Sequence, residues 1–192
     1  GVIIRVWDAL GEYDSNSELE LAKLIRYDEI TDIILSDIMN NIDREKRMVL
    51  AIEGYSHSSN AGPLIDLVTI STLLRLKILK NLHGFTVMGE DVNLTVYQPT
   101  EVKQRAAALV YPPIQKGKKV EYRNPQGIAG GSFKKPEIYQ ALLDNLNLKG
   151  DVWVEYLREQ SEEIFEMKSI PKPIEDINDA KTLYEIIKAG NK

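Results

Sequence analysis

The feature that most restricts the fold of this chain is a short apolar run that ends in a carboxylate. Residues 48–52 read Met-Val-Leu-Ala-Ile, and Glu53 follows them directly. A run of this length that is apolar on both faces predicts a strand in the middle of a sheet, with helices covering that sheet. We therefore expect an α/β domain in which Glu53 stands at the end of a central strand.

Strand and helix patterns alternate along the rest of the chain. The β-branched run at residues 2–7 predicts a strand that ends near Asp8. Ser17 and Glu20 form a capping box, and a helix with a kink or break near residues 27–29 is expected to follow. Further helices are predicted at residues 63–82, 99–109, 135–146, 151–168 and 177–189, short strands at 85–88 and 94–97, and a loop rich in Gly, Pro and Lys at 110–133.

Length and composition exclude several classes of protein. The 192 residues fit one compact domain, predicted over residues 1–192. They include no cysteine, which excludes disulfides, thiolate metal sites and cysteine nucleophiles. No apolar run is long enough to cross a membrane, so we expect no membrane partner. There is no phosphate-binding P-loop, and nothing around Ser56, Ser58 or Ser59 forms a nucleophile elbow.

Charge is distributed unevenly along the chain. The net charge of −5 argues against a general nucleic-acid binder, but residues 102–135 carry eight basic side chains against Glu121 alone. This segment therefore has a net charge of +7 and the remainder has −12. A basic lobe on an acidic body is compatible with phosphate contacts at one face, and a solvated loop whose lysines keep it soluble explains the charge equally well.

Two aspartates near the carboxyl end form a second acidic site. Asp176 and Asp179 are three positions apart at a predicted helix start, so both carboxylates lie on one face. Together with Glu53 they offer only oxygen ligands, which suit Mg²⁺ or Mn²⁺, and two such ions can activate water against a phosphodiester. The alternatives are that Asp176 caps the helix, that Asp179 is a solvated acid of the first turn, and that Glu175 points to solvent.

Five segments in a fixed order carry a resemblance to a known family. They are residues 52–55 (Ile-Glu-Gly-Tyr), the long helix after a Ser/Asn/Gly loop, residues 96–103 (Val-Tyr-Gln-Pro-Thr-Glu-Val-Lys), residues 130–135 (Gly-Gly-Ser-Phe-Lys-Lys) and residues 176–180 (Asp-Ile-Asn-Asp-Ala). In order and spacing they resemble the RuvC-type Holliday-junction resolvases, above all their phage relatives. The resemblance implies an RNase H-like fold, with a central mixed β-sheet flanked by α-helices.

The resemblance also implies a Mg²⁺-dependent endodeoxyribonuclease, with Mn²⁺ as a substitute. Glu53, Asp176 and Asp179 would bind the metal, and Lys103 would face the phosphate near the reacting group. The family's first catalytic aspartate lies either upstream of this chain or at Asp8. We favour the first, because Asp8 lacks the glycine/serine-rich turn that normally follows that residue.

The implied substrate is branched DNA, such as a four-way junction, cut during recombination and repair in the cytoplasm of a bacterial or phage-infected cell. A junction is two-fold symmetric, so a homodimer is expected, with the helix at 63–82 as its interface and Ile70, Leu73 or Leu76 on the outward side. The residues expected to contact DNA are Tyr55, Lys103, Arg105, Lys116, Lys118, Lys119, Lys134 and Lys135. Two other interpretations stay open: another RNase H-like nuclease of the terminase or flap type, and a protein that binds branched DNA without cutting it.

Overall fold

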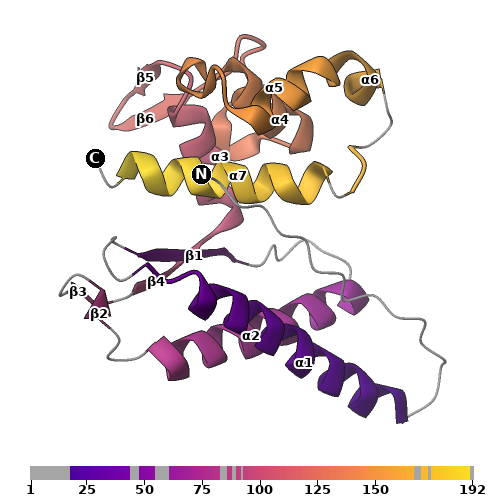
Figure 1. Ribbon diagram of the computed structural model, residues 1–192. Helices are drawn as coiled ribbons and strands as arrows, with labels where there is room; N and C mark the ends of the chain where they lie inside the picture. The colour runs from indigo at the N-terminus through magenta and orange to yellow at the C-terminus, as the bar shows by residue number, and fades with distance from the viewer. Residues whose placement is uncertain are drawn as a thin grey trace. The chain divides into compact units, whose positions relative to one another are not determined.

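A computed structural model describes the chain in two compact units, residues 1–96 and 97–192. Within them the described residues are 18–43, 48–54, 61–82, 86–87, 90–91, 93–166, 170–172 and 174–190. They form a mixed α/β structure that is mostly helical, with small sheets (Figure 1). The strand predicted at residues 2–7, Asp8 and Tyr55 lie outside the described residues. The single domain predicted from chain length stays a prediction.

The first unit is built on two long helices that lie against each other. Its elements are α1 (Glu18–Asn40), β1 (Val49–Glu53), α2 (Ala61–Leu82), β2 (Thr86–Val87), β3 (Glu90–Asp91) and β4 (Asn93–Tyr97). Tyr27 and Ile30 of α1 and Ile78 and Leu82 of α2 are buried. They supply the apolar contact that each amphipathic helix needs to be stable.

Helix α1 runs without a break through residues 27–29, where the sequence allowed a kink. Lys77 of α2 holds this stretch by ion pairs to Asp28 at 2.8 Å and Asp32 at 2.5 Å. The Thr31 hydroxyl also donates a hydrogen bond to the Tyr27 carbonyl, at 2.8 Å. These contacts, together with the buried Tyr27, keep the helix continuous.

Strand β1 confirms the predicted position of the apolar run but is less buried than expected. It pairs with β4, although α2 and the β2–β3 pair lie between them in sequence. All five of its residues are half-buried. In the part of the chain that the structure describes, β1 has one neighbouring strand, and β2 and β3 form an antiparallel pair of their own.

In its described residues, the second unit consists of helices and one hairpin (Figure 1). Its buried apolar side chains form two clusters. Its elements are α3 (Pro99–Ala108), β5 (Pro113–Lys116), β6 (Lys119–Tyr122), α4 (Lys135–Asp144), α5 (Val152–Glu159), α6 (Ser161–Glu166) and α7 (Ile174–Gly190), with short 3-10 turns at Gly130–Ser132 and Leu146–Leu148. Helix α4 lies at the centre, because Tyr139 and Leu142 enter one cluster while Ile138 and Ala141 enter the other.

Two elements of this unit differ from the sequence prediction. The single helix predicted at 151–168 is two helices, α5 and α6, which meet at Gln160 with φ −93° and ψ 0°. The loop predicted at 110–133 contains the hairpin of β5 and β6. Its residues are mostly exposed, so they show little of the apolar alternation by which a strand is recognised from sequence.

A glycine lets the turn before α4 approach α3 closely. A Cβ atom at Gly130 would lie 2.6 Å from the Ala107 Cβ and 3.3 Å from the Lys103 carbonyl oxygen. A Cβ at Gly131 would meet the end of the Gln104 side chain, at 3.1 Å from its amide nitrogen. Ala107 is fully buried in the apolar cluster, so it has nowhere to move, whereas Gln104 is exposed.

We therefore expect Gly130→Ala to lower the free energy of unfolding by about 1–3 kcal/mol, the usual effect of overpacking a closely packed contact. Gly131→Ala is the matched control and should change it by less than about 1 kcal/mol, because a flexible side chain gives way. Urea denaturation followed by circular dichroism measures both. Equal effects of the two substitutions would contradict the close approach of the turn and α3.

Candidate functional site

The acidic residues of α7 meet a lysine from the start of α4. The Lys135 ammonium binds the Asp179 carboxylate and lies 3.3 Å from Glu175 Oε1. Glu175 and Asp179 are one helical turn apart, so a single cation reaches both. Asp176 is exposed and lies 3.8 Å from the Lys172 ammonium. The structure thus brings Glu175, Asp179 and Lys135 together, with Asp176 beside them on the same helical turn.

Three alternatives drawn from the sequence for these acids are wrong. Helix α7 begins at Ile174, earlier than predicted, so Asp176 lies inside the first turn and cannot be its N-cap. Asp179 is half-buried against Lys135 and is not a solvated acid of the first turn. Glu175 turns toward Lys135 and leaves only 27% of its side chain exposed.

Burial changes the proton affinity of this pair. It raises the pKa of the Asp179 carboxyl above its ordinary value, and the neighbouring charges of Glu175 and Asp176 add to the effect while Lys135 opposes it. For Lys135, burial by itself lowers the pKa, but the contacts with Asp179 and Glu175 outweigh burial and raise it. Asp179 therefore takes up a proton more readily than an exposed aspartate, and any cation bound here competes with that proton.

The chemistry of these acids suits a hard divalent cation, because their oxygens are the ligands that Mg²⁺ prefers. In the structure the Lys135 ammonium is the cation that Glu175 and Asp179 bind. Across the described ranges, however, no three His, Cys, Asp or Glu side chains come together to hold a metal ion. The predicted role of Asp176 and Asp179 as metal ligands thus stays a prediction.

Glu53, the other predicted ligand, belongs to the first unit. It is the last residue of β1 and is half-buried. Its backbone carbonyl accepts a hydrogen bond from Arg75 of α2, with an N···O distance of 3.4 Å. Its predicted role as a metal ligand stays a prediction.

The basic residues predicted to contact DNA fall into different environments of the second unit. Arg105 lies over the Tyr97 ring and is 2.9 Å from Glu101. Lys103 is half-buried on α3. Lys134 is exposed just before α4. Lys116, Lys118 and Lys119 share the tip of the β5–β6 hairpin, while Lys135 alone is engaged by the acids of α7.

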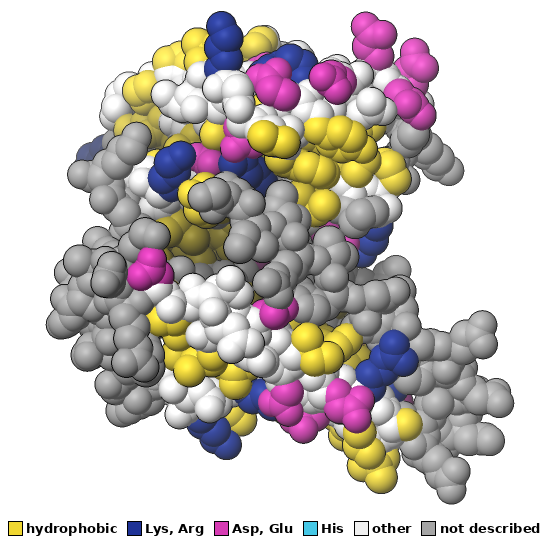
Figure 2. Space-filling model, viewed as in Figure 1, with side chains coloured by type: hydrophobic (Ala, Val, Ile, Leu, Met, Phe, Trp, Pro, Cys, Tyr) yellow, Lys and Arg dark blue, Asp and Glu magenta, His cyan; other side chains and the backbone are white. Residues whose placement is uncertain are grey.

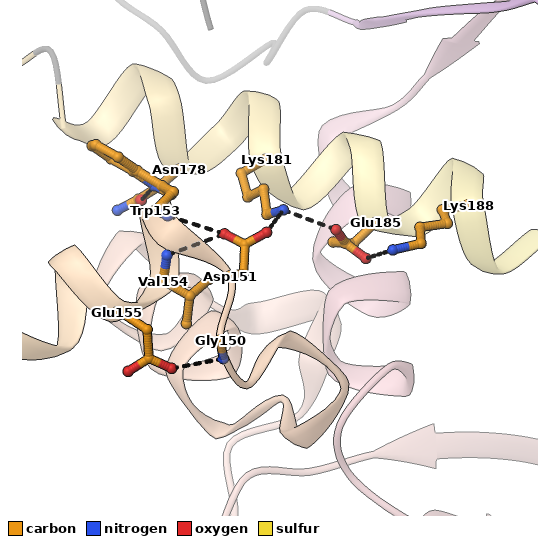
Figure 3. A network of polar contacts seen from close by, with 9 residues as sticks. All are labelled: Gly150, Asp151, Trp153, Val154, Glu155, Asn178, Lys181, Glu185 and Lys188. Atoms are coloured by element: carbon orange, nitrogen blue, oxygen red, sulfur yellow. Dashed lines mark hydrogen bonds and ion pairs between the residues drawn. The ribbon is translucent and has the colours of Figure 1, made fainter. Parts of the chain in front are cut away.

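A buried ion network holds α7 in place (Figure 3). Only 4% of Lys181 is exposed, and its ammonium lies 2.6 Å from Asp151 Oδ2 and 3.0 Å from Glu185 Oε1. The other carboxylate oxygen of Asp151 accepts hydrogen bonds from the backbone N–H groups of Trp153 and Val154, which caps α5. The network thereby ties α7 to the start of α5.

A second contact joins the same two helices. The Trp153 indole N–H donates to the Asn178 side-chain oxygen at 3.0 Å, and Asn178 is 3% exposed. Asn178 and Lys181 are three positions apart, so both contacts fall on one face of α7. They fix the rotation of the helix about its axis, and with it the direction in which Glu175 and Asp179 point.

The charges of the network are stabilised where they lie. Burial by itself raises the pKa of Asp151, but hydrogen bonds from Lys181, Val154 and Trp153 outweigh burial and lower it. Burial likewise lowers the pKa of Lys181, while its contacts with Asp151 and Glu185 outweigh this and raise it. Both groups are therefore charged near neutral pH, as a buried ion pair requires.

Comparison with known proteins gives little similarity. No family model matches the chain, and no solved structure matches it. 8-Amino-7-oxononanoate synthase from Nitrosomonas eutropha is 26% identical over 94 residues, which are 48% of this chain and 24% of that protein. The matched part is thus about a quarter of the length of the synthase. Among the described helices, none has the length and apolar character of a membrane span.

These findings correct the resemblance drawn from the sequence. The assignment to the RuvC-type resolvases is wrong: no family model supports it, and the similarity that was found is to a different kind of protein. Four of the five segments are only four to eight residues long, and the fifth is a helix without a motif of its own, so the resemblance depends mainly on their order along the chain.

The ion network gives a direct test of what positions α7. We expect Lys181→Met to lower the free energy of unfolding by about 3 kcal/mol, because it removes the lysine that pairs with Asp151 and the nearer of the two lysines that pair with the buried Glu185. Lys188→Met is the control: it removes an ion pair to the same Glu185, but the Lys188 side chain is 53% exposed, so the loss should stay below about 1 kcal/mol. Urea denaturation measures both, and similar losses would contradict the role of the network.

Proposed function

We propose that this chain is a metal-dependent endonuclease that hydrolyses phosphodiester bonds in DNA. The observation that supports this most is the single cation, the Lys135 ammonium, held between Glu175 and Asp179. The contact shows that a positive charge is bound on α7 by carboxylate oxygens, the kind of ligand that Mg²⁺ prefers. Basic side chains on α3, the hairpin and the start of α4 lie in the same unit and suit contacts with phosphate groups.

Each group has a proposed role. Asp176 and Asp179 would hold Mg²⁺, or Mn²⁺ in its place, while the role of Glu53 in the first unit as a metal ligand stays a separate prediction. When bound, the metal supplies the activation of water and the stabilisation of charge on the phosphate. Lys135 and Lys103 would then face the phosphate groups of the substrate. An RNase H-like sheet stays the proposed arrangement for the strands, and the pairing of β1 with β4 is compatible with it.

Branched DNA, processed in recombination or repair in a bacterial or phage-infected cytoplasm, stays the predicted substrate. No family model supports the resemblance that implied this substrate, so a comparison of a four-way junction with linear duplex DNA of the same sequence decides the substrate.

A second candidate function has its own supporting observation. Glu175 and Asp179 already have a cation in Lys135, so their charges are compensated without a metal. In that case the acids have a structural role, joining α7 to α4, and the protein binds DNA without cutting it.

One substitution distinguishes the two candidate functions. If the chain is a nuclease, Asp179→Asn should lower the cleavage rate in Mg²⁺ by about a hundredfold or more, the scale expected when charge stabilisation at a reacting phosphate is lost, while DNA binding is retained. Glu162→Gln, which changes an exposed acid of α6, is the control and should cut at the wild-type rate. Gel assays with junction and linear DNA, in Mg²⁺, Mn²⁺ or EDTA, measure this.

Two outcomes would count against cleavage. If the wild-type protein binds DNA but does not cut it with either metal, the non-cleaving candidate holds. If Asp179→Asn cuts as fast as the wild type, cleavage does not depend on α7, and the proposed site is wrong.

A second copy of the chain is the proposed partner of α2. Ile65, Leu76 and Leu79 are 64%, 46% and 55% exposed, and Thr69 and Thr72 lie between them. These five positions follow one another at steps of four, three, four and three, the spacing of a helix seam that packs against another helix. Of the residues predicted to face outward, Leu76 does so, while Ile70 and Leu73 are half-buried.

The dimer has a matched control on the same helix. We expect Leu76→Glu combined with Leu79→Glu to convert a dimer into a monomer at micromolar concentration, because the charges would be buried in the seam. Leu67→Glu should leave the dimer intact: Leu67 is 57% exposed but does not belong to the stripe. Light scattering measures the mass of each. A wild-type monomer at this concentration would contradict the proposal.

A further inference from the structure

The hairpin of β5 and β6 is a regular ribbon. Its strands pair in register from Pro113 opposite Tyr122 to Lys116 opposite Lys119. Gly117, with φ 62°, and Lys118 form a two-residue turn between them. Tight hairpin turns that match the twist of the strands need a positive φ at the first central position, where glycine has no steric cost. The segment is therefore a defined ribbon with lysines around its turn.

The root of the ribbon is anchored in the core. Tyr122 packs against the apolar cluster that contains Ala107 and Phe133. Beyond it, the Arg123 guanidinium donates to the Gly127 carbonyl at 2.6 Å, and the buried Asn124 side chain accepts a hydrogen bond from the Ile128 N–H at 2.8 Å. These contacts fix the direction in which the ribbon leaves the unit.

The rest of the ribbon is open to solvent on both faces. All four residues of β5 and the first two of β6 are exposed. Ile114 and Val120 are 44% and 51% exposed, and because Val120 lies opposite Gln115, the neighbour of Ile114, these two apolar side chains lie on opposite faces. A partner that contacts both faces of the ribbon would cover both of these side chains.

The tip is positively charged and mostly uncompensated. In the part of the chain described here, Lys118 and Lys119 form no ion pair. Lys116 is 3.5 Å from Glu121, which Arg123 also binds at 2.7 Å. The hydrogen bond from Arg123, with the help of both neighbouring positive charges and against partial burial, lowers the pKa of Glu121, so this acid stays ionised and compensates only one of its two partners.

We infer that this ribbon enters the major groove of duplex DNA. The major groove is about 12 Å wide and admits a two-stranded ribbon. Lys118 and Lys119 would contact the phosphate groups of the groove walls. Ile114 and Val120 lie on opposite faces, so one of them, on the face turned to the groove floor, would lie against base edges such as thymine methyl groups. The inference rests on the proposed function for its substrate, DNA, and adds which feature of the DNA is bound and by which element.

The charges favour DNA over a protein strand as the occupant. Lysines and a proline along an edge are features that discourage the addition of another strand, and here Pro113, Lys116 and Lys119 occupy these positions. At the end of the unit where α6 lies, Glu162, Glu163 and Glu166 form an acidic surface (Figure 2). A polyanion is thus attracted to the ribbon and repelled from α6.

The test is the salt dependence of DNA binding, measured by fluorescence anisotropy with linear duplex and junction DNA. We expect Lys118→Gln combined with Lys119→Gln to reduce the slope of log K against log salt by about two, one for each lost phosphate contact, and to weaken binding by about tenfold or more. Lys80→Gln combined with Lys149→Gln removes the same charge from exposed sites elsewhere and should leave the slope unchanged. Equal slopes for the two double variants would overturn the inference.

Insertion into the groove has its own readout. Guanine N7 faces the major groove, so the wild-type protein should protect it from dimethyl sulfate, and Ile114→Ser combined with Val120→Ser should reduce this protection. Unchanged N7 reactivity with bound wild-type protein would overturn groove insertion. No DNA binding at low salt would also overturn it and leave a protein partner as the occupant.

The failure of this inference and that of the nuclease proposal can be told apart. If the ribbon variants change binding and N7 protection but the wild type never cuts, the ribbon inference stands and the nuclease proposal falls. If cleavage depends on Asp179 but the ribbon variants bind with the wild-type slope and protection, the nuclease proposal stands and the ribbon inference falls.

Discussion

The second unit depends on one buried cation. Lys181 lies between Asp151 and Glu185, and it can stay charged at 4% exposure only because both carboxylates compensate it. Asp151 in turn caps α5, so the lysine couples the end of one helix to the face of another. Such a network tolerates little rotation or sliding of α7, since any shift would leave a buried charge unpaired. The position of every other side chain on α7 follows from this.

Glu175 and Asp179 depend on that constraint most directly. Asp179 lies one position after Asn178 and two before Lys181, so it points to a neighbouring side of α7, toward the start of α4, and Glu175 lies on that side one turn earlier. There they meet Lys135, which the proline at the second position of α4 helps to place at the start of that helix. The ion network of Lys181 thus fixes the position of α7, and this position allows Glu175 and Asp179 to pair with Lys135.

The sequence predicted the elements whose pattern is local. Helix α3 begins at Pro99 as expected, and β1 ends at Glu53, because a proline and an apolar run are local features. The pairing of Lys135 with Asp179 could not be predicted, since the two are 44 residues apart and meet only through the packing of α4 on α7. The ribbon was missed because its strands are exposed; Gly117 between lysines was the available indication of a tight turn.

Both candidate functions depend on which cation compensates the negative charge of the acids of α7. Lys135 stands next to the exposed Lys134, at the edge of the basic segment, and yet it is bound by carboxylates. A DNA phosphate near the start of α4 would therefore compete with Glu175 and Asp179 for the same ammonium. If the phosphate takes Lys135, the half-buried Asp179 is left with an uncompensated charge in a place that already raises its pKa. It would then have to gain a proton or another cation, so DNA binding by this protein would be coupled to the occupancy of the acidic site.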